Sequence, residues 1–193
     1  MKKTILNSLG INASKDIPIE DLFSKDEQTL NGYGITTDDV KKLKLLKNFC
    51  NAYNKEIPVR TNRQILRAND AVKEMYNILR DLDHEEVWVM FMNRANQIQG
   101  REMFYVGGLD QCTLDCHYIA KRALEMNSKA LILFHNHPSG IAFPSEADIK
   151  QTEILSNMLK AIDMSLTDHI IISNTQYYSF AEQESFPIKN IKS

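Results

Sequence analysis

The sequence predicts an α+β protein, α/β-like in the order of its elements, built on a mixed β-sheet with flanking helices. Continuous apolar runs of strand length at residues 86–92 and 130–134 are typical of strands that have both faces covered. Residues 114–126 and 145–162 instead carry apolar side chains at helical spacing. Strands that alternate with helices in this way indicate helices packed against a sheet.

The domain organisation follows from a change of character along the chain. A length of 193 residues is typical of one domain, or of one domain with a small appendage. Residues 1–56 are polar and helical in pattern, with a helix that Thr37 or Asp38 can cap. Pro58 disfavours helix at the residue before it, so residues 57–62 form an extended connector. We therefore predict a small helical region at 1–56 and a larger domain at 57–193.

The larger domain contains the predicted strands and most of the remaining helices. In chain order these are a helix at 69–82, a strand hairpin at 86–92 and 97–106, a helix at 114–126, a strand at 130–134, a helix at 145–162, and strands at 169–173 and 177–180. The strand near the C-terminus opens on His169, which we expect to be a hydrogen-bonded structural group rather than a metal ligand.

Bulk composition excludes several classes of protein. The formal net charge of −2 provides no global attraction for nucleic acid or for a membrane surface. The apolar runs are too short to cross a bilayer, and the N-terminus lacks the apolar core of a signal peptide. Three cysteines do not make a disulfide framework. The sequence therefore predicts a cytoplasmic protein with no membrane partner, and it does not indicate an oligomeric state.

The residues that carry chemistry lie between His135 and Asp148. His135 and His137 are two apart at the end of a predicted strand, so their rings project to the same side if the chain stays extended. Asp148 follows in the first turn of the helix that begins near Ser145. Two imidazoles and one carboxylate leave an open position on a tetrahedral zinc ion, as in catalytic sites. Such a zinc lowers the pKa of a bound water to about 7.

The spacing of these residues resembles the JAMM motif of the MPN/JAB metallopeptidase superfamily, which reads His-x-His, seven residues, Ser, two residues, Asp. The closer resemblance is to the RadC family, through HNHPSG at 135–140, PSEAD at 144–148 and TDHIII at 167–172. It covers roughly residues 61–180. The resemblance implies an MPN/JAB domain, which has a cytidine-deaminase-like fold. It also implies a zinc-dependent hydrolase that cleaves an amide or isopeptide bond through a zinc-bound hydroxide.

The resemblance also implies a role for each site residue. His135, His137 and Asp148 would be the zinc ligands. Glu86, at the start of a strand, would be the general base that takes a proton from the water and delivers it to the leaving group. Ser145 would donate a hydrogen bond to the oxyanion or to the bound water. Ser145 is also an ideal helix N-cap, and the two roles are compatible.

Two acidic residues compete for the role of the base. Glu85 and Glu86 are neighbours, and in an extended segment they point to opposite faces, so only one of them can reach the metal. The spacing from the strand start in the resembled families favours Glu86.

A second functional class also remains open. Residues 32–35, Gly-Tyr-Gly-Ile, and the helix after them faintly resemble a helix-hairpin-helix, whose backbone amides contact DNA phosphates with help from nearby lysines. The alternative to a hydrolase is thus a DNA-repair-associated RadC-like binding protein with a structural or vestigial metal site. For the hydrolase, the sequence does not separate a peptide substrate from a small amide.

Overall fold

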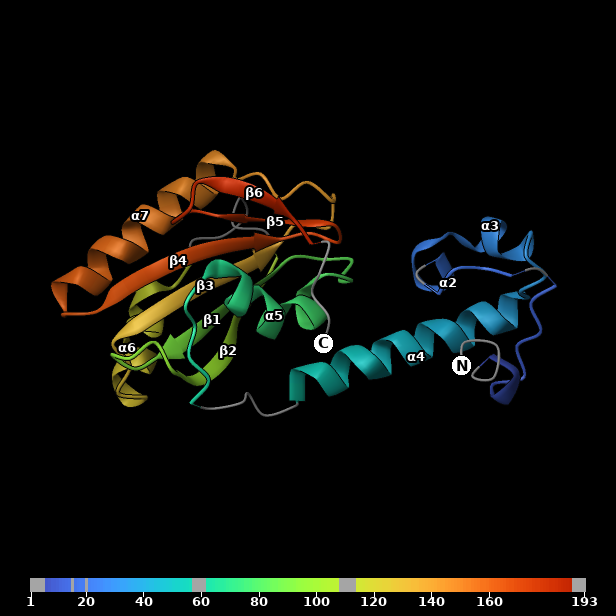
Figure 1. Cartoon of the computed structure of the whole chain (residues 1–193), viewed down its shortest axis with the longest axis horizontal. Helices are drawn as coiled ribbons and strands as arrows, with labels where there is room; N and C mark the ends of the chain where they lie inside the picture. The colour runs from blue at the N-terminus through green and yellow to red at the C-terminus, as the bar shows by residue number, and fades with distance from the viewer. Residues whose placement is uncertain (1–5, 15, 20, 57–61, 108–113, 189–193) are drawn as a thin grey trace. The chain divides into compact units, whose positions relative to one another are not determined.

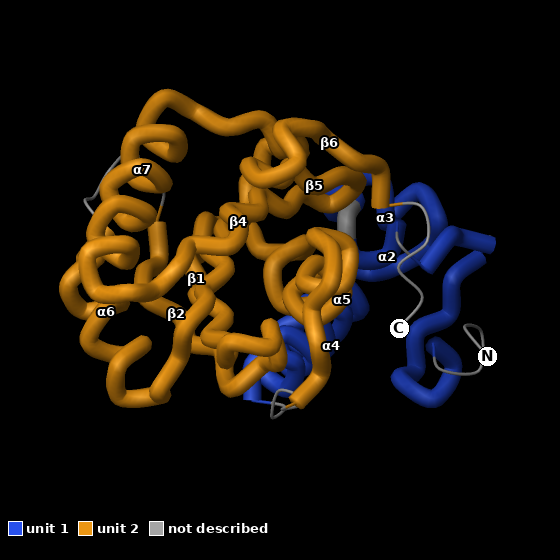
Figure 2. Tube along the Cα trace, turned by 60° about the vertical axis from the view of Figure 1, so that its left-hand side comes forward, with its two compact units in different colours: residues 1–57 blue, residues 58–193 orange. Residues whose placement is uncertain are grey.

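The computed structural model of the chain describes residues 6–14, 16–19, 21–56, 62–107 and 114–188 (Figure 1). The chain divides into two compact units, residues 1–57 and residues 58–193, which Figure 2 shows in different colours. The connector expected at 57–62 lies outside the described residues, except for Asn62. Each unit has an apolar core of its own.

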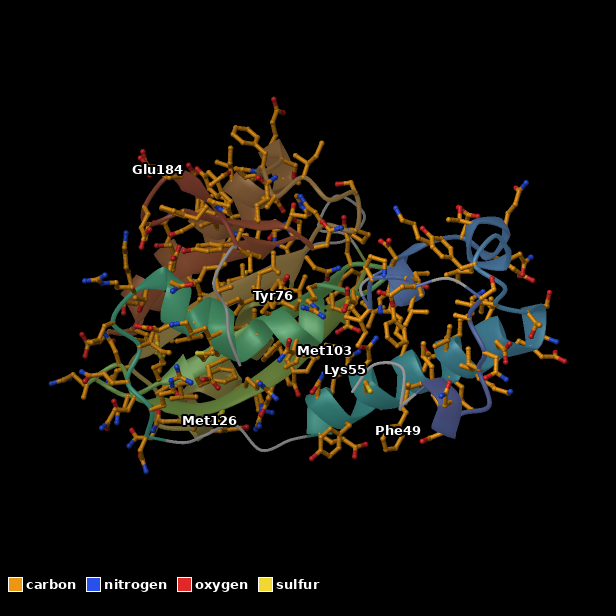
Figure 3. All side chains as sticks on the ribbon, turned by 45° about the vertical axis from the view of Figure 1, so that its right-hand side comes forward. Phe49, Lys55, Tyr76, Met103, Met126 and Glu184 are labelled. Carbon is orange, nitrogen blue, oxygen red and sulfur yellow. The ribbon has the colours of Figure 1, made fainter. Side chains whose placement is uncertain are left out.

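The first unit is helical. Its elements are α2 (Asp21–Ser24), α3 (Glu27–Asn31) and α4 (Thr37–Glu56). Asp26 caps α3 by accepting a hydrogen bond from the backbone N–H of Thr29 at 2.8 Å. The turn into α4 contains Gly34 at a φ of +80°, a conformation that glycine adopts at little cost. The side chains of Val40 and Leu43, early in α4, are buried in the core of this unit. Later in α4 the apolar side chains are exposed, and Phe49, labelled in Figure 3, is 66% exposed.

The second unit is built on one six-stranded sheet with the order β2-β1-β3-β4-β5-β6. The strands are β1 (Glu86–Met92), β2 (Ile98–Val106), β3 (Ala130–Asn136), β4 (Ser165–Ile172), β5 (Gln176–Ser179) and β6 (Glu184–Pro187). β3 and β4 pair in parallel, whereas the other neighbouring strands pair antiparallel. The predicted α+β class with a mixed sheet is therefore confirmed.

Helices cover both faces of this sheet (Figure 1). α5 (Ala68–Leu79) packs on the face that carries Trp88 and Met90, and α6 (Cys116–Glu125) and α7 (Glu146–Ala161) pack on the face that carries Val87 and Val89. Successive side chains of a strand alternate between the faces, so β1 is apolar at every interior position. Among the described helices, none combines the length and the apolar character needed to span a membrane.

Some strands differ from prediction because pairing with a neighbouring strand includes residues that have no apolar strand pattern. β1 has the predicted bounds, because its apolar run ends where its burial ends. β4 begins at Ser165, earlier than the predicted start at His169, because Ser165 and Leu166 pair with the start of β3. β6 was not predicted, since it has only four residues, most of them exposed, and its partner strand is β5.

We expect the second unit to fold without the first, because helices of the second unit cover both faces of its own sheet. A chain that begins at Pro58 should show a cooperative thermal transition by circular dichroism, with the midpoint of the corresponding transition in the full chain. Leu133, which is fully buried, supplies the control: Leu133→Ala should lower the stability of both chains by about 2–5 kcal/mol. A truncated chain without a cooperative transition would show that the boundary is wrong.

Candidate metal centre

The end of β3 places two imidazoles side by side. His135 is the second-last residue of β3 and is 1% exposed. His137 follows directly, and its backbone N–H donates to the carbonyl of Ile172 at 3.0 Å, which continues the pairing with β4. The extended chain therefore turns both rings to one side, as the spacing predicts. Their Nε2 atoms lie 2.9 Å apart.

The first turn of α7 brings a carboxylate to the same point. Ser145 is the N-cap of α7, and its Oγ accepts from the backbone N–H of Asp148 at 3.2 Å. In return, Oδ2 of Asp148 accepts from the backbone N–H of Ser145 at 2.7 Å and from its hydroxyl at 2.9 Å. This capping box fixes the carboxylate. Its Oδ1 lies 3.2 Å from Nε2 of His135, and its Oδ2 lies 3.6 Å from Nε2 of His137.

The three groups fit a zinc ion by geometry and by chemistry. The ligand atoms of a tetrahedral zinc at about 2.0–2.1 Å stand about 3.3 Å apart. The separations among His135, His137 and Asp148 range from 2.9 to 3.6 Å around that value. Imidazole nitrogen and carboxylate oxygen are zinc ligands, and His135 and Asp148 are buried. Among the described residues, these three form the group of His, Cys, Asp or Glu side chains that lie close enough together to hold a metal ion.

Electrostatics at the site favour a cation. Burial alone would raise the pKa of Asp148, but its close contacts with the His135 and His137 rings, and its bond from the backbone N–H of Ser145, outweigh burial and hold the pKa well below the usual range. Burial lowers the pKa of His137, whereas its bonds to Asp148 and to the carbonyl of Ile141 raise it, with a net increase. The carboxylate is therefore ionised at neutral pH, and it places a negative charge beside two imidazoles.

A third histidine supports the site from behind. His169, on β4, is fully buried, and its Nε2 lies 2.8 Å from Nδ1 of His135. Its Nδ1 lies 2.6 Å from the hydroxyl oxygen of Thr152 on α7, and its ring stacks on Phe180. Burial, followed by the nearby His135 ring, lowers the pKa of His169 well below the ordinary value, so the ring is neutral. The expectation of a hydrogen-bonded structural histidine thus agrees with its surroundings.

The structure does not bring Glu86 to this group, and the strand register explains the correction. Val87 is paired with His135, so these two side chains lie on the same face of the sheet. Glu86 therefore points to the opposite face. There its carboxylate accepts from the indole N–H of Trp88 at 2.8 Å and lies 2.9 Å from Nε2 of His84. A carboxylate held in this way cannot act on the other side of the sheet.

Glu85 lies on the side that Glu86 does not reach. Its carbonyl accepts from the N–H of Gly107 at 2.7 Å, so extended pairing continues through it and its side chain alternates to the face of His135. The side chain is partly buried, and its charge contributes to the raised pKa of His137. Of the two neighbouring carboxylates, Glu85 is thus the one close to the candidate metal ligands.

Comparison with known proteins places the chain in a family. Residues 65–185, more than half of the chain, match the model of the RadC-like JAB domain. The chain belongs to this family. The resemblance to RadC proteins predicted from the sequence is confirmed, and the fold of the second unit is that of a RadC-like JAB domain.

Curated relatives of this RadC-like chain carry the name UPF0758 protein. One from Flavobacterium johnsoniae is 36% identical over 124 residues, which cover 64% of this chain and 54% of that protein. The YkfG protein of Escherichia coli K12 is 37% identical over 113 residues, 58% of this chain and 72% of that protein. One from Vibrio atlanticus is 37% identical over 107 residues, 55% and 48% respectively. The matched region thus spans about half the length of the first and the third.

Two polar residues position the site of this JAB domain, and sequence reasoning assigned that role to neither of them. Asn136 lies between the two histidines, and its amide oxygen accepts from the backbone N–H of Glu86 at 2.8 Å while its NH₂ donates to the carbonyl of His84 at 2.8 Å. Thr152 was detectable in principle, because it lies one helical turn after Asp148 and therefore on the same face of α7.

The capping box predicts a stability effect for Ser145. Ser145→Ala removes the hydroxyl that accepts from the backbone N–H of Asp148, so chemical denaturation should report a loss of about 1 kcal/mol in the free energy of unfolding. Ser145→Thr keeps a hydroxyl at the N-cap and should retain most of the stability. Equal stabilities of the two variants would contradict this capping role.

Proposed function

We propose that this RadC-like JAB domain is a zinc-dependent hydrolase of the JAMM type that cleaves an amide or isopeptide bond. The observation that carries the proposal is the convergence of His135, His137 and Asp148 from a strand end and a helix start, with ligand atoms all within 4.8 Å of one another. A metal held by three protein groups keeps a position open for water, which distinguishes catalytic from structural zinc sites.

The chain's own hydrogen bonds prepare these groups as ligands. Nδ1 of His137 lies 2.9 Å from the carbonyl oxygen of Ile141, which can only accept, so Nδ1 carries the proton and Nε2 presents its lone pair to the centre. The ionised carboxylate of Asp148 supplies the negative charge. Zinc bound there would act as a Lewis acid and would lower the pKa of a water molecule to about 7.

We assign the general base to Glu85. Val87 pairs with His135, so alternation along the extended chain puts the side chain of Glu85 on the face of His135. The charge of Glu85 raises the pKa of His137. In amide hydrolysis, a carboxylate in this place accepts the proton of the attacking water and delivers it to the leaving nitrogen. Glu86, expected from the sequence to do this, instead holds His84 and Trp88 on the other face.

Ser145 serves this site through Asp148. A hydroxyl has one proton, and that of Ser145 is directed at Oδ2 of Asp148. We therefore assign Ser145 to holding the carboxylate in place. The role expected from the resemblance, a hydrogen bond to the oxyanion, requires the hydroxyl to leave Asp148 during the reaction and stays a prediction.

The alternative function, DNA association through the first unit, lacks an observation of comparable weight. α3, the turn at Gly34 and α4 do follow one another, as in a helical hairpin. However, Lys41 and Lys42 on α4 form ion pairs with Asp38 and Asp39 at 3.0 and 3.2 Å, which reduces the positive charge that a phosphate would meet. Contact with DNA stays a prediction, and the hydrolase is the function that we favour.

We expect one zinc ion per chain. The purified chain of 193 residues, equilibrated with zinc and dialysed, should retain one zinc ion per chain by metal analysis, whereas the double variant His135→Ala, His137→Ala should retain none. His117→Ala is the matched control, because His117 is exposed on α6 and should be irrelevant to zinc. Stoichiometric zinc in the double variant would overturn the assignment of the ligands.

We expect Glu85→Gln to abolish most hydrolysis while leaving zinc in place. The variant removes proton transfer but no ligand, and such transfer is worth about 10²–10⁴-fold in rate. A panel of fluorogenic peptide and isopeptide amides, assayed with wild type and variant, measures the loss in kcat. Glu86→Gln should lose far less, because glutamine can still bond to Trp88 and His84. A panel that wild type leaves uncut, or the reverse order of the two variants, would contradict the proposal.

A further inference from the structure

We propose that His169 and Thr152 fix the tautomer of His135, so that its Nε2 presents a lone pair to the metal centre. His169 would thus be a positioning residue and not a ligand. The inference rests on the proposed metal-binding function for its purpose, but the chain of hydrogen bonds that carries it exists in the protein alone.

The direction of donation along these hydrogen bonds is set at Thr152, in α7. The hydroxyl oxygen of Thr152 lies 2.5 Å from the backbone carbonyl oxygen of Asp148. A carbonyl oxygen can only accept, so the single proton of this hydroxyl is donated to it. The lone pairs of the Thr152 oxygen are then left to accept a hydrogen bond from another group.

That group is His169, which donates to Thr152 from one ring nitrogen and accepts from His135 at the other. Nδ1 of His169 lies 2.6 Å from the Thr152 oxygen, so it must carry a proton to make this contact favourable. In a neutral imidazole the other nitrogen is then bare. This bare Nε2 lies 2.8 Å from Nδ1 of His135 and accepts its proton. His135 is therefore protonated at Nδ1, and its Nε2 is left with a lone pair.

The lone pair points to the right place. Nε2 of His135 is the atom that lies 2.9 Å from Nε2 of His137 and 3.2 Å from Oδ1 of Asp148. The opposite tautomer would place a proton on that atom and would block it as a ligand. The two histidines thus reach the same state by different means, since the carbonyl of Ile141 fixes His137 directly.

Packing keeps competing partners away from this chain of hydrogen bonds, the relay from Thr152 through His169 to His135. His169 is fully buried, and the ring of Phe180 stacks on it with centroids 4.6 Å apart and planes 9° apart. The backbone of β4 is held as well, because the carbonyl of His169 accepts from the N–H of Phe180 at 3.0 Å. The ring can therefore neither turn over freely nor exchange Thr152 for water.

The test compares Thr152→Val with Thr152→Ser in the full chain. Valine has nearly the shape of threonine but cannot accept from His169, whereas serine keeps the hydroxyl. Zinc affinity, measured by competition with a chelator, should fall by about 10–100-fold in the valine variant and stay close to wild type in the serine variant. The thermal midpoints of the metal-free proteins show whether a loss of affinity reflects loss of fold.

A second measurement reads the tautomer itself. Nitrogen-15 NMR of the metal-free chain distinguishes a histidine protonated at Nδ1 from one protonated at Nε2. Wild type should show His135 protonated at Nδ1, and Thr152→Val should move the population toward Nε2. His169→Gln, which places an acceptor near the position of Nε2, should bind zinc more tightly than His169→Leu.

The possible outcomes separate this inference from the proposed function. A wild-type His135 protonated at Nε2 would overturn the relay, whatever the zinc affinity. Equal zinc affinities of the valine and serine variants would also overturn it. If wild-type protein binds no zinc, the metal function fails, and the NMR tautomer alone decides whether the relay exists.

Discussion

The carboxylate of Asp148 is the group on which the rest of the site depends. It closes the capping box at the start of α7, so its position is set by the same hydrogen bonds that begin the helix. Oδ1 of Asp148 faces His135, and the backbone carbonyl of Asp148 accepts a hydrogen bond from the hydroxyl of Thr152. One residue thus provides a candidate ligand and the end point of the relay. The hydrogen bonds that begin α7 therefore also fix the position of a candidate ligand.

Burying these polar groups costs free energy, and the structure offsets the cost group by group. A buried polar atom without a partner is unfavourable by about 1–3 kcal/mol. His135, Asp148 and His169 are all almost fully buried, yet each of their side-chain nitrogens and oxygens has a polar atom within 3.2 Å. The contact between Nε2 of His135 and Nε2 of His137, at 2.9 Å, is unfavourable by itself. Two lone pairs that face each other repel unless a cation or a proton lies between them. This local conflict is what a metal ion would relieve.

Sequence patterns predicted the sheet, its helices and the three converging groups, because each depends on local periodicity or spacing. They failed at Glu86, because the face on which the first residue of a strand lies depends on pairing with a distant strand. The pair Val87–His135 decides that question, and one sequence does not show which residues pair. The surroundings of His169 were predictable in kind, as a buried hydrogen-bonded group, but its partners were not. His135 meets it because β3 and β4 pair in parallel, and Thr152 meets it because α7 packs against β4.

The face of the sheet opposite the candidate metal ligands explains why the side chains of His135 and His137 can point the same way. Asn136 separates them and must point to that other face, where it bridges the N–H of Glu86 and the carbonyl of His84. Its amide therefore ties the end of β3 to the start of β1 and keeps the segment extended. The charge of buried Glu86 is matched there by His84, whose pKa is raised by Asp83 and by Glu86. Glu86 thus contributes to the site without facing it, because the polar cluster that it anchors holds the strand end from which His135 and His137 project.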